Sequence, residues 1–117
     1  MKKFCLVLFC LLLCGCNSLK GSGKIKCDDL KEIKGYNGTV IIDVRTNEEY
    51  NGIHIDNAIN IPVEDFENEI KNHNNINLDT PIVVYCKSGA RSSKAYDILK
   101  KLGYKHIYDL GAMGSCI

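Results

Sequence analysis

The chain has 117 residues, 45% of them hydrophobic, which is enough to form the core of a single domain. Its formal net charge is +1, tryptophan is absent, and no basic run is interleaved with aromatic residues. This balance argues against nucleic acid as a partner, because nucleic-acid-binding proteins carry strongly basic surfaces.

The first 15 residues have the pattern of a secretory signal peptide. Two lysines precede the apolar stretch FCLVLFCLLL, which is too short to span a membrane. The sequence LCGC that follows resembles the lipobox of bacterial lipoproteins, in which the chain is cut before a cysteine that carries lipid. We therefore expect a signal peptide over residues 1–15, lipidation of Cys16, and a lipid-anchored, extracytoplasmic protein of the bacterial cell envelope. The alternative is an ordinary cleaved signal that leaves Cys16 as a spare thiol.

Residues 16–24 are polar and include Gly and Ser, so we expect a tether that precedes a domain over residues 25–117. Once the signal is removed and Cys16 is lipidated, three thiols remain: Cys27, Cys86 and Cys116. An odd number outside the cytoplasm argues against a pure disulfide framework and indicates a free, reactive thiol. No CxxC or HxxxH spacing occurs, so no metal site is expected.

The first half of the domain begins with a possible short strand at residues 24–27. A helix is expected next, with Asp28 as its N-cap. Residues 39–44 are β-branched and almost wholly apolar, which predicts a strand buried on both faces. Thr46 and Glu49 have the spacing of a capping box, so a short helix should begin there.

The second half continues the alternation. Strands are predicted at residues 58–62, 81–86 and 106–110, with a helix at 63–72 and a second helix that ends at Gly103. Apolar strands that alternate with amphipathic helices favour an α/β fold in which helices cover both faces of a mostly parallel sheet.

Cys86 stands at the end of a predicted buried strand, just before a helix. Ligands of open parallel sheets bind at the carboxyl ends of the strands. Gly89 allows the intervening loop to curl, so that its N–H groups point inward at an anion. These dipoles, together with Lys87 and Arg91, should lower the pKa of the Cys86 thiol and make its sulfur nucleophilic. The alternative is a core cysteine that simply closes an apolar strand.

Three segments resemble the rhodanese-like sulfurtransferases: DVRTNEEYNGIHIDNAINIP, the loop YCKSGARS, and GYKHIYDLGAM. The resemblance implies a rhodanese-like three-layer α/β/α fold and a double-displacement reaction. In that reaction Cys86 takes a sulfane sulfur from a small anionic donor, thiosulfate or a persulfide. The resulting persulfide passes the sulfur to a thiol or cyanide, and no metal or organic cofactor is needed.

The resemblance also implies roles for the residues around Cys86. Arg91, with a contribution from Lys87, would bind the anionic donor, and the loop amides would hold the terminal sulfur. Asp43 and Arg45 match the family's D-V-R and are interpreted as structural, with Arg45 paired to an acid such as Glu49. The loop residues implied in binding are Lys87, Ser88, Gly89, Ala90, Arg91 and Ser92.

The chain departs from the family pattern at two glycine positions. Ile53 replaces the glycine before His54, and Asn57 replaces the second glycine. Asparagine tolerates a left-handed backbone, so the second change should be mild. We interpret His54 as a structural histidine rather than a base.

There are three alternatives to sulfur transfer. Cysteine phosphatases and arsenate reductases need an arginine one residue later than Arg91, so this loop fits them poorly. A non-catalytic sulfur-binding module would not require the complete loop. A thiol–disulfide protein would link Cys86 to Cys116, although Cys116 could equally be a loose terminal residue. Cys27 is most simply a core residue.

Overall fold

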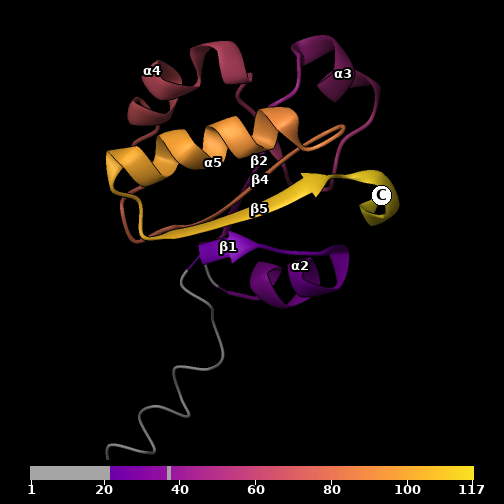
Figure 1. The fold of residues 1–117 in the computed structure, drawn as a ribbon, viewed down its shortest axis with the longest axis horizontal. Helices are drawn as coiled ribbons and strands as arrows, with labels where there is room; N and C mark the ends of the chain where they lie inside the picture. The colour runs from indigo at the N-terminus through magenta and orange to yellow at the C-terminus, as the bar shows by residue number, and fades with distance from the viewer. Residues whose placement is uncertain (1–21, 37) are drawn as a thin grey trace, which may run out of the picture.

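The computed structural model describes residues 22–36 and 38–117, and the side chain of residue 115 is not described. These residues form the predicted three-layer α/β/α fold around a five-stranded, wholly parallel sheet of order β1-β5-β4-β2-β3 (Figure 1). The strands are β1 (Ser22–Lys24), β2 (Val40–Asp43), β3 (Ile59–Asn60), β4 (Pro81–Cys86) and β5 (His106–Ala112). The helices are α2 (Cys27–Lys34), α3 (Asn47–Gly52), α4 (Phe66–Lys71) and α5 (Ala90–Leu102), with short 3₁₀ turns η1 (Val63–Asp65) and η2 (Gly114–Cys116).

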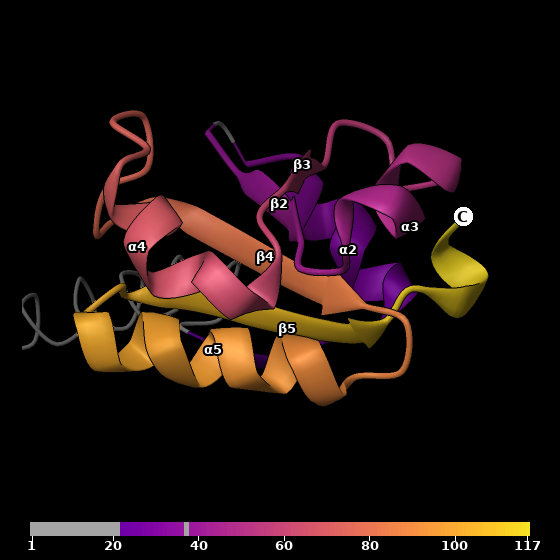
Figure 2. The same ribbon diagram turned by 90° about the horizontal axis from the view of Figure 1, so that it is seen from above.

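Helices α4 and α5 cover one face of the sheet, and α2 covers the other (Figures 1 and 2). Ala95 and Leu99 of α5 are fully buried against the central strands, as their spacing predicts. Leu30 and Ile33 of α2 are buried in a separate cluster on the opposite face. Because strands β2 and β4 lie between the two clusters, their residues are apolar almost throughout.

The capping signals predicted at Thr46 and Gly103 are confirmed. Thr46 caps α3, with its hydroxyl accepting from the N–H of Glu49 at 3.2 Å, while the Thr46 N–H donates to the Glu49 carboxylate at 3.1 Å. Gly103 ends α5 in the left-handed conformation, at φ 97°. Asn57 also lies in the left-handed region, at φ 70°, as expected for an asparagine at a glycine position.

The N-terminal elements differ from the prediction. The first strand is β1 at Ser22–Lys24, inside the segment expected to be a tether, and Cys27 already begins α2. Lys26 rather than Asp28 occupies the N-cap position. Strand β1 has no apolar alternation, and it forms because the edge of β5 offers parallel backbone partners. That edge could not be located from local sequence.

Cys27 and Cys116 form a disulfide across a separation of 89 residues, with Cα atoms 5.3 Å apart. This corrects the interpretation of Cys27 as a simple core residue. It also corrects the hypothesis of a Cys86–Cys116 link, since Cys86 is a free thiol packed on the α5 side of the sheet. The disulfide partners pack on the α2 side.

The predicted signal peptide and the lipidation site Cys16 lie outside the described residues. Within residues 22–36 and 38–117, no helix has the length and apolar character needed to cross a bilayer.

Candidate active site

Cys86 is the last residue of β4, which lies between β2 and β5 in the sheet. Its side chain is fully buried, and its backbone carbonyl accepts from the N–H of Met113, at the end of the neighbouring strand, at 3.0 Å. The sulfur therefore occupies the carboxyl edge of a parallel sheet, where α/β proteins build their sites.

The loop after Cys86 curls around the sulfur. The backbone N–H of Gly89 donates to the Cys86 Sγ at 2.9 Å, and that of Ser92 donates at 3.4 Å. Gly89 has a φ of +107°, which a residue with a side chain adopts only under strain, so the turn requires glycine. The loop thus forms the predicted amide cradle, with Ser92 in the first turn of α5.

The cradle changes the acidity of the thiol. Burial acts to raise the pKa of Cys86, but hydrogen bonds from the backbones of Ser92, Gly89 and Ser88 and from the Ser92 hydroxyl outweigh it. The pKa of Cys86 consequently lies below its ordinary value. The site favours a thiolate, or any other anionic sulfur that takes its place.

The two cationic residues of the loop differ in whether they are free to bind an anion. Lys87 is exposed to solvent, as are Ser88 and Ala90, whereas Ser92 is buried. Arg91 is held by Glu49 through two contacts, Nη1 to Oε1 at 2.7 Å and Nη2 to Oε2 at 3.3 Å. Hydrogen bonds from Arg91 and from the Thr46 backbone lower the pKa of Glu49 to about 2. A charged carboxylate therefore screens the arginine that was expected to bind the donor.

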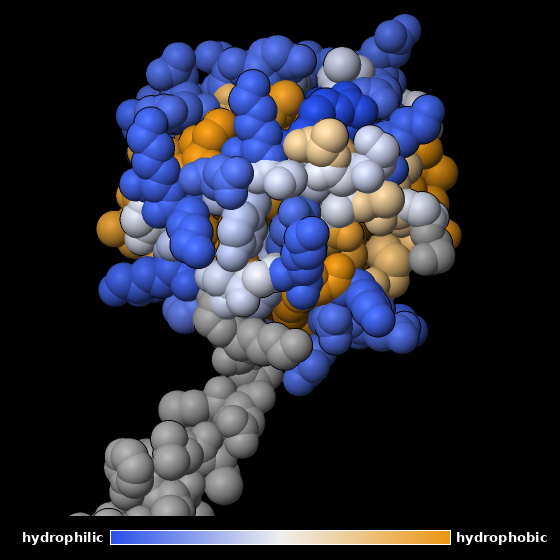
Figure 3. Space-filling model, viewed as in Figure 1, coloured by the Kyte–Doolittle hydropathy of each residue, from blue (hydrophilic) through white to orange (hydrophobic). Residues whose placement is uncertain are grey.

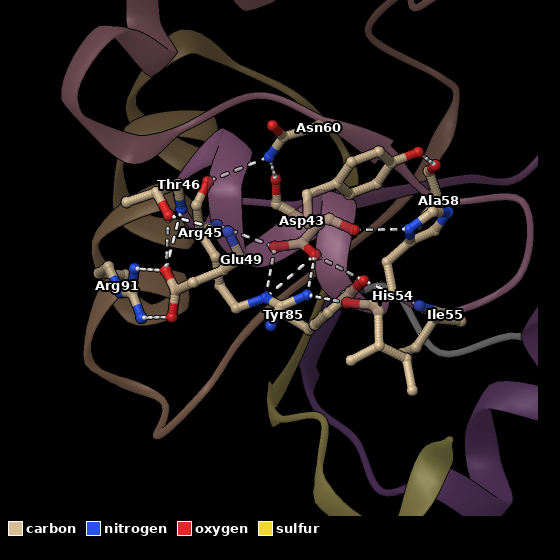
Figure 4. A network of polar contacts seen from close by, with 12 residues as sticks. Asp43, Arg45, Thr46, Glu49, His54, Ile55, Ala58, Asn60, Tyr85 and Arg91 are labelled. Atoms are coloured by element: carbon tan, nitrogen blue, oxygen red, sulfur yellow. Dashed lines mark hydrogen bonds and ion pairs between the residues drawn. The ribbon is translucent and has the colours of Figure 1, made fainter.

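Asp43 and Arg45 form a buried ion pair of 2.7 Å (Figure 4). This corrects the expected pairing of Arg45 with Glu49. The Asp43 carboxylate also accepts from the Tyr85 hydroxyl at 2.8 Å, and Arg45 donates to the carbonyl of Ile53 at 2.6 Å. Burial raises the pKa of Tyr85, so its hydroxyl stays protonated and able to donate. The network joins the ends of β2 and β4 to the loop after α3.

His54 lies in this loop, outside the cradle. Its Nδ1 is 2.9 Å from the carbonyl oxygen of Tyr50, and its ring stacks on the Tyr50 ring at a centroid distance of 3.8 Å. The Tyr50 hydroxyl in turn donates to the carbonyl of Ala58 at 2.5 Å. These contacts fit the structural role expected for His54.

The structure brings Cys86, Gly89 and Ser92 together, while Arg91 is turned to Glu49. Sequence reasoning missed Glu49 as the partner of Arg91 and Tyr85 as the partner of Asp43. The capping box identified Glu49 as a residue that caps α3. Its contact with Arg91 spans 42 residues and therefore leaves no signal in the local sequence. Within the described parts of the chain, no cluster of histidine, cysteine or acidic side chains could hold a metal ion.

Curated proteins similar to this chain include named sulfurtransferases. The thiosulfate sulfurtransferase PspE of Escherichia coli is 38% identical over 72 residues, which are 62% of this chain and 68% of PspE. A putative mitochondrial thiosulfate sulfurtransferase of Schizosaccharomyces pombe is 38% identical over 87 residues, with 66% of this chain and 61% of that protein covered. A probable molybdopterin-synthase adenylyltransferase of Porphyra purpurea is 36% identical over 77 residues, with 65% of this chain covered. The match covers 20% of the length of the Porphyra purpurea protein and 58% of the length of the Bacillus subtilis protein YqhL.

Solved structures similar to this chain include a rhodanese. A structure described as a rhodanese with anions from E. coli is 33% identical, has a TM-score of 0.61, and covers 68% of this chain and 91% of its own. A Staphylococcus saprophyticus protein is 27% identical, with a TM-score of 0.68 and coverages of 81% and 93%. The family model described as "Rhodanese-like domain" matches residues 26–112, from the start of α2 to the end of β5. The chain belongs to the rhodanese-like domain family.

Proposed function

We propose that this protein is a sulfurtransferase in which Cys86 carries the sulfur as a persulfide. The observation that carries the proposal is the free, buried thiol of Cys86, which receives N–H groups from Gly89 and Ser92 and has a lowered pKa. Such a cradle stabilises one anionic sulfur without a metal or organic cofactor. Relatives named as thiosulfate sulfurtransferases and as a putative sulfur carrier protein support the same chemistry.

The proposed reaction has two displacement steps. The Cys86 thiolate attacks the outer sulfur of thiosulfate, a new S–S bond forms, and sulfite leaves with the electron pair of the broken bond. An acceptor nucleophile, a thiolate or cyanide, then attacks the terminal sulfur and releases the Cys86 thiolate. The outer sulfur becomes bonded to the acceptor, and no electron is supplied from outside. A persulfide donor would react in the same way, with a thiolate as the leaving group.

The proposal extends to a lipid-anchored position in the bacterial cell envelope, on the extracytoplasmic side of the membrane. The lipobox-like sequence before Cys16 is one support. The Cys27–Cys116 disulfide is another, because disulfides persist in oxidising compartments and are rare in the cytosol. Incorporation of labelled fatty acid into the wild-type protein, but not into a Cys16→Ala variant, would test this position.

The proposed function is tested by incubating the full-length protein, with its Cys27–Cys116 disulfide intact, with thiosulfate and locating added mass by peptide mass spectrometry. We expect one extra sulfur atom on the peptide that contains Cys86, and its removal by cyanide with formation of thiocyanate. A protein that gains no sulfur at Cys86 from either thiosulfate or a small persulfide would contradict the proposal.

The pH dependence of persulfide formation should follow the ionisation of Cys86. Because the pKa of this thiol is lowered, the rate should rise with pH and level off below the ordinary pKa of cysteine. The Ser92 hydroxyl donates to the Gly89 carbonyl at 3.1 Å, within the loop that holds the sulfur, and it also acts to lower the pKa of Cys86. Replacement of Ser92 by alanine should therefore move the inflection to higher pH. A rate profile of Ser92→Ala, with Ser93→Ala on the exposed side of α5 as control, checks the shift. An inflection unmoved in Ser92→Ala would contradict the assigned role of its hydroxyl.

Glu49 should weaken the binding of a doubly charged donor, because it neutralises Arg91. In Glu49→Gln the amide can still complete the capping box of α3, while Arg91 keeps its full charge. We expect the KM for thiosulfate to fall about threefold at low ionic strength, and by less at high salt. Glu48→Gln removes the same charge from an exposed neighbour and should change KM little. A higher KM in Glu49→Gln would mean that the ion pair positions Arg91 rather than screening it.

A further inference from the structure

The Cys27–Cys116 disulfide faces a cavity of about 350 Å³ on the α2 side of the sheet. Both cysteines line this cavity, together with Leu30, Ile55 and the half-exposed Ile117. On the right of Figure 3, hydrophobic side chains lie at the surface among hydrophilic ones. Figure 1 has the same viewpoint, and the C-terminus lies on that side. The volume lies at the lower end of the range typical of small-ligand pockets. The disulfide is therefore both half-buried and approachable from solvent.

The walls of the cavity carry charges of both signs. Lys31 and Lys34 come from α2, and Asp28 and Asp56 provide carboxylates. The chemistry that suits such a site is a small ligand with both a carboxylate and an ammonium group. We propose that this cavity is a thiol-exchange site, in which a small zwitterionic thiol reacts with the Cys27–Cys116 disulfide.

The exchange is balanced by the thiol itself. A thiolate of the small molecule bonds to one cysteine sulfur, the Cys27–Cys116 bond breaks, and the other cysteine leaves as a thiolate. A second small thiol displaces the first, which leaves two protein thiols and one small-molecule disulfide. Each cysteine gains one electron, and the two small thiols are the reductant.

The same disulfide lies next to the end of β5, which supports the catalytic loop. The N–H of Met113 donates to the carbonyl of Cys86, and a side chain at Gly89 would lie 4.0 Å from the Cα of Gly111. Cys116 follows in η2, where its N–H donates to the Met113 carbonyl within the same turn, and the disulfide ties this turn covalently to α2. Reduction should therefore loosen the support of the loop and slow sulfur transfer, a consequence that rests on the proposed function.

The exchange is tested in full-length Cys86→Ser protein, so that the catalytic thiol cannot take part. The protein is equilibrated with reduced and oxidised glutathione at graded ratios, trapped with N-ethylmaleimide, and mapped by peptide mass spectrometry. We expect a glutathione adduct at Cys27 or Cys116 at intermediate ratios, and maleimide on both Cys27 and Cys116 at reducing ratios. A pair that stays oxidised at every ratio in the folded protein, but reacts in urea, would overturn the proposal.

Two matched comparisons complete the test. In Lys31→Gln/Lys34→Gln, exchange with glutathione should slow about threefold, while exchange with uncharged 2-mercaptoethanol should be unchanged. Equal effects on both thiols would overturn the cavity as a binding site.

In Cys27→Ser/Cys116→Ser, sulfur transfer from thiosulfate to cyanide should slow about threefold or more. An unchanged rate would overturn the coupling of the disulfide to the loop. Because exchange is read without Cys86, its failure and that of the proposed function are distinguishable.

Discussion

Replacement of Cys86 by serine is expected to lower the rate of sulfur transfer from thiosulfate to cyanide by at least about a thousandfold, the scale on which loss of a catalytic nucleophile is felt. Serine has nearly the same size, but its hydroxyl is not ionised near neutral pH and cannot form a persulfide. Cys86 is the free cysteine among the described residues, so the disulfide partners offer no replacement.

The measurement is steady-state thiocyanate formation by Cys86→Ser and by the surface variant Ser93→Ala, which should retain wild-type activity. Equal circular dichroism spectra and unfolding midpoints for the two variants would show that the loss is chemical. Thiocyanate formation by Cys86→Ser within tenfold of the wild-type rate would place the sulfur on another group and refute the mechanism.

Replacement of Asp43 by alanine is expected to lower the free energy of unfolding by about 3–5 kcal/mol, because it leaves a buried positive charge unpaired. Arg45 is only 4% exposed, and its pKa is raised chiefly by its hydrogen bond to Asp43. The change would also deprive the Tyr85 hydroxyl of its acceptor. Single domains have total stabilities of about 5–15 kcal/mol, so the variant should be marginal.

Urea unfolding of Asp43→Ala measures the loss, with Asp97→Ala on the exposed side of α5 as the matched loss of a carboxylate. The control should change stability by no more than about 0.5 kcal/mol. The double variant Asp43→Ala/Arg45→Met should recover part of the loss, since it removes the unpaired charge as well. A loss below about 1 kcal/mol in the single variant would show that Arg45 finds water or another partner.

Features of this protein that depend on neighbouring residues could be predicted from the amino-acid sequence. Apolar runs predicted β2 and β4, the spacing of Ala95 and Leu99 predicted the buried face of α5, and Gly103 predicted its end. The same holds for the centre of the site. The order of strand end, Cys86, glycine turn and helix start is local, and it is sufficient to aim backbone N–H groups at the sulfur.

Contacts between groups that are distant along the chain follow from the packing of the whole domain. Arg45 pairs with Asp43, two residues away, because both are buried together under Tyr85 of the adjoining strand. Glu49 is thereby left to Arg91, on α5. Strand β1 and the disulfide have the same origin, since each depends on the position of β5 or the turn that follows it. Patterns along the chain report periodicity and capping, whereas charge and thiol partners are selected by the packing of strands and helices that are remote in sequence.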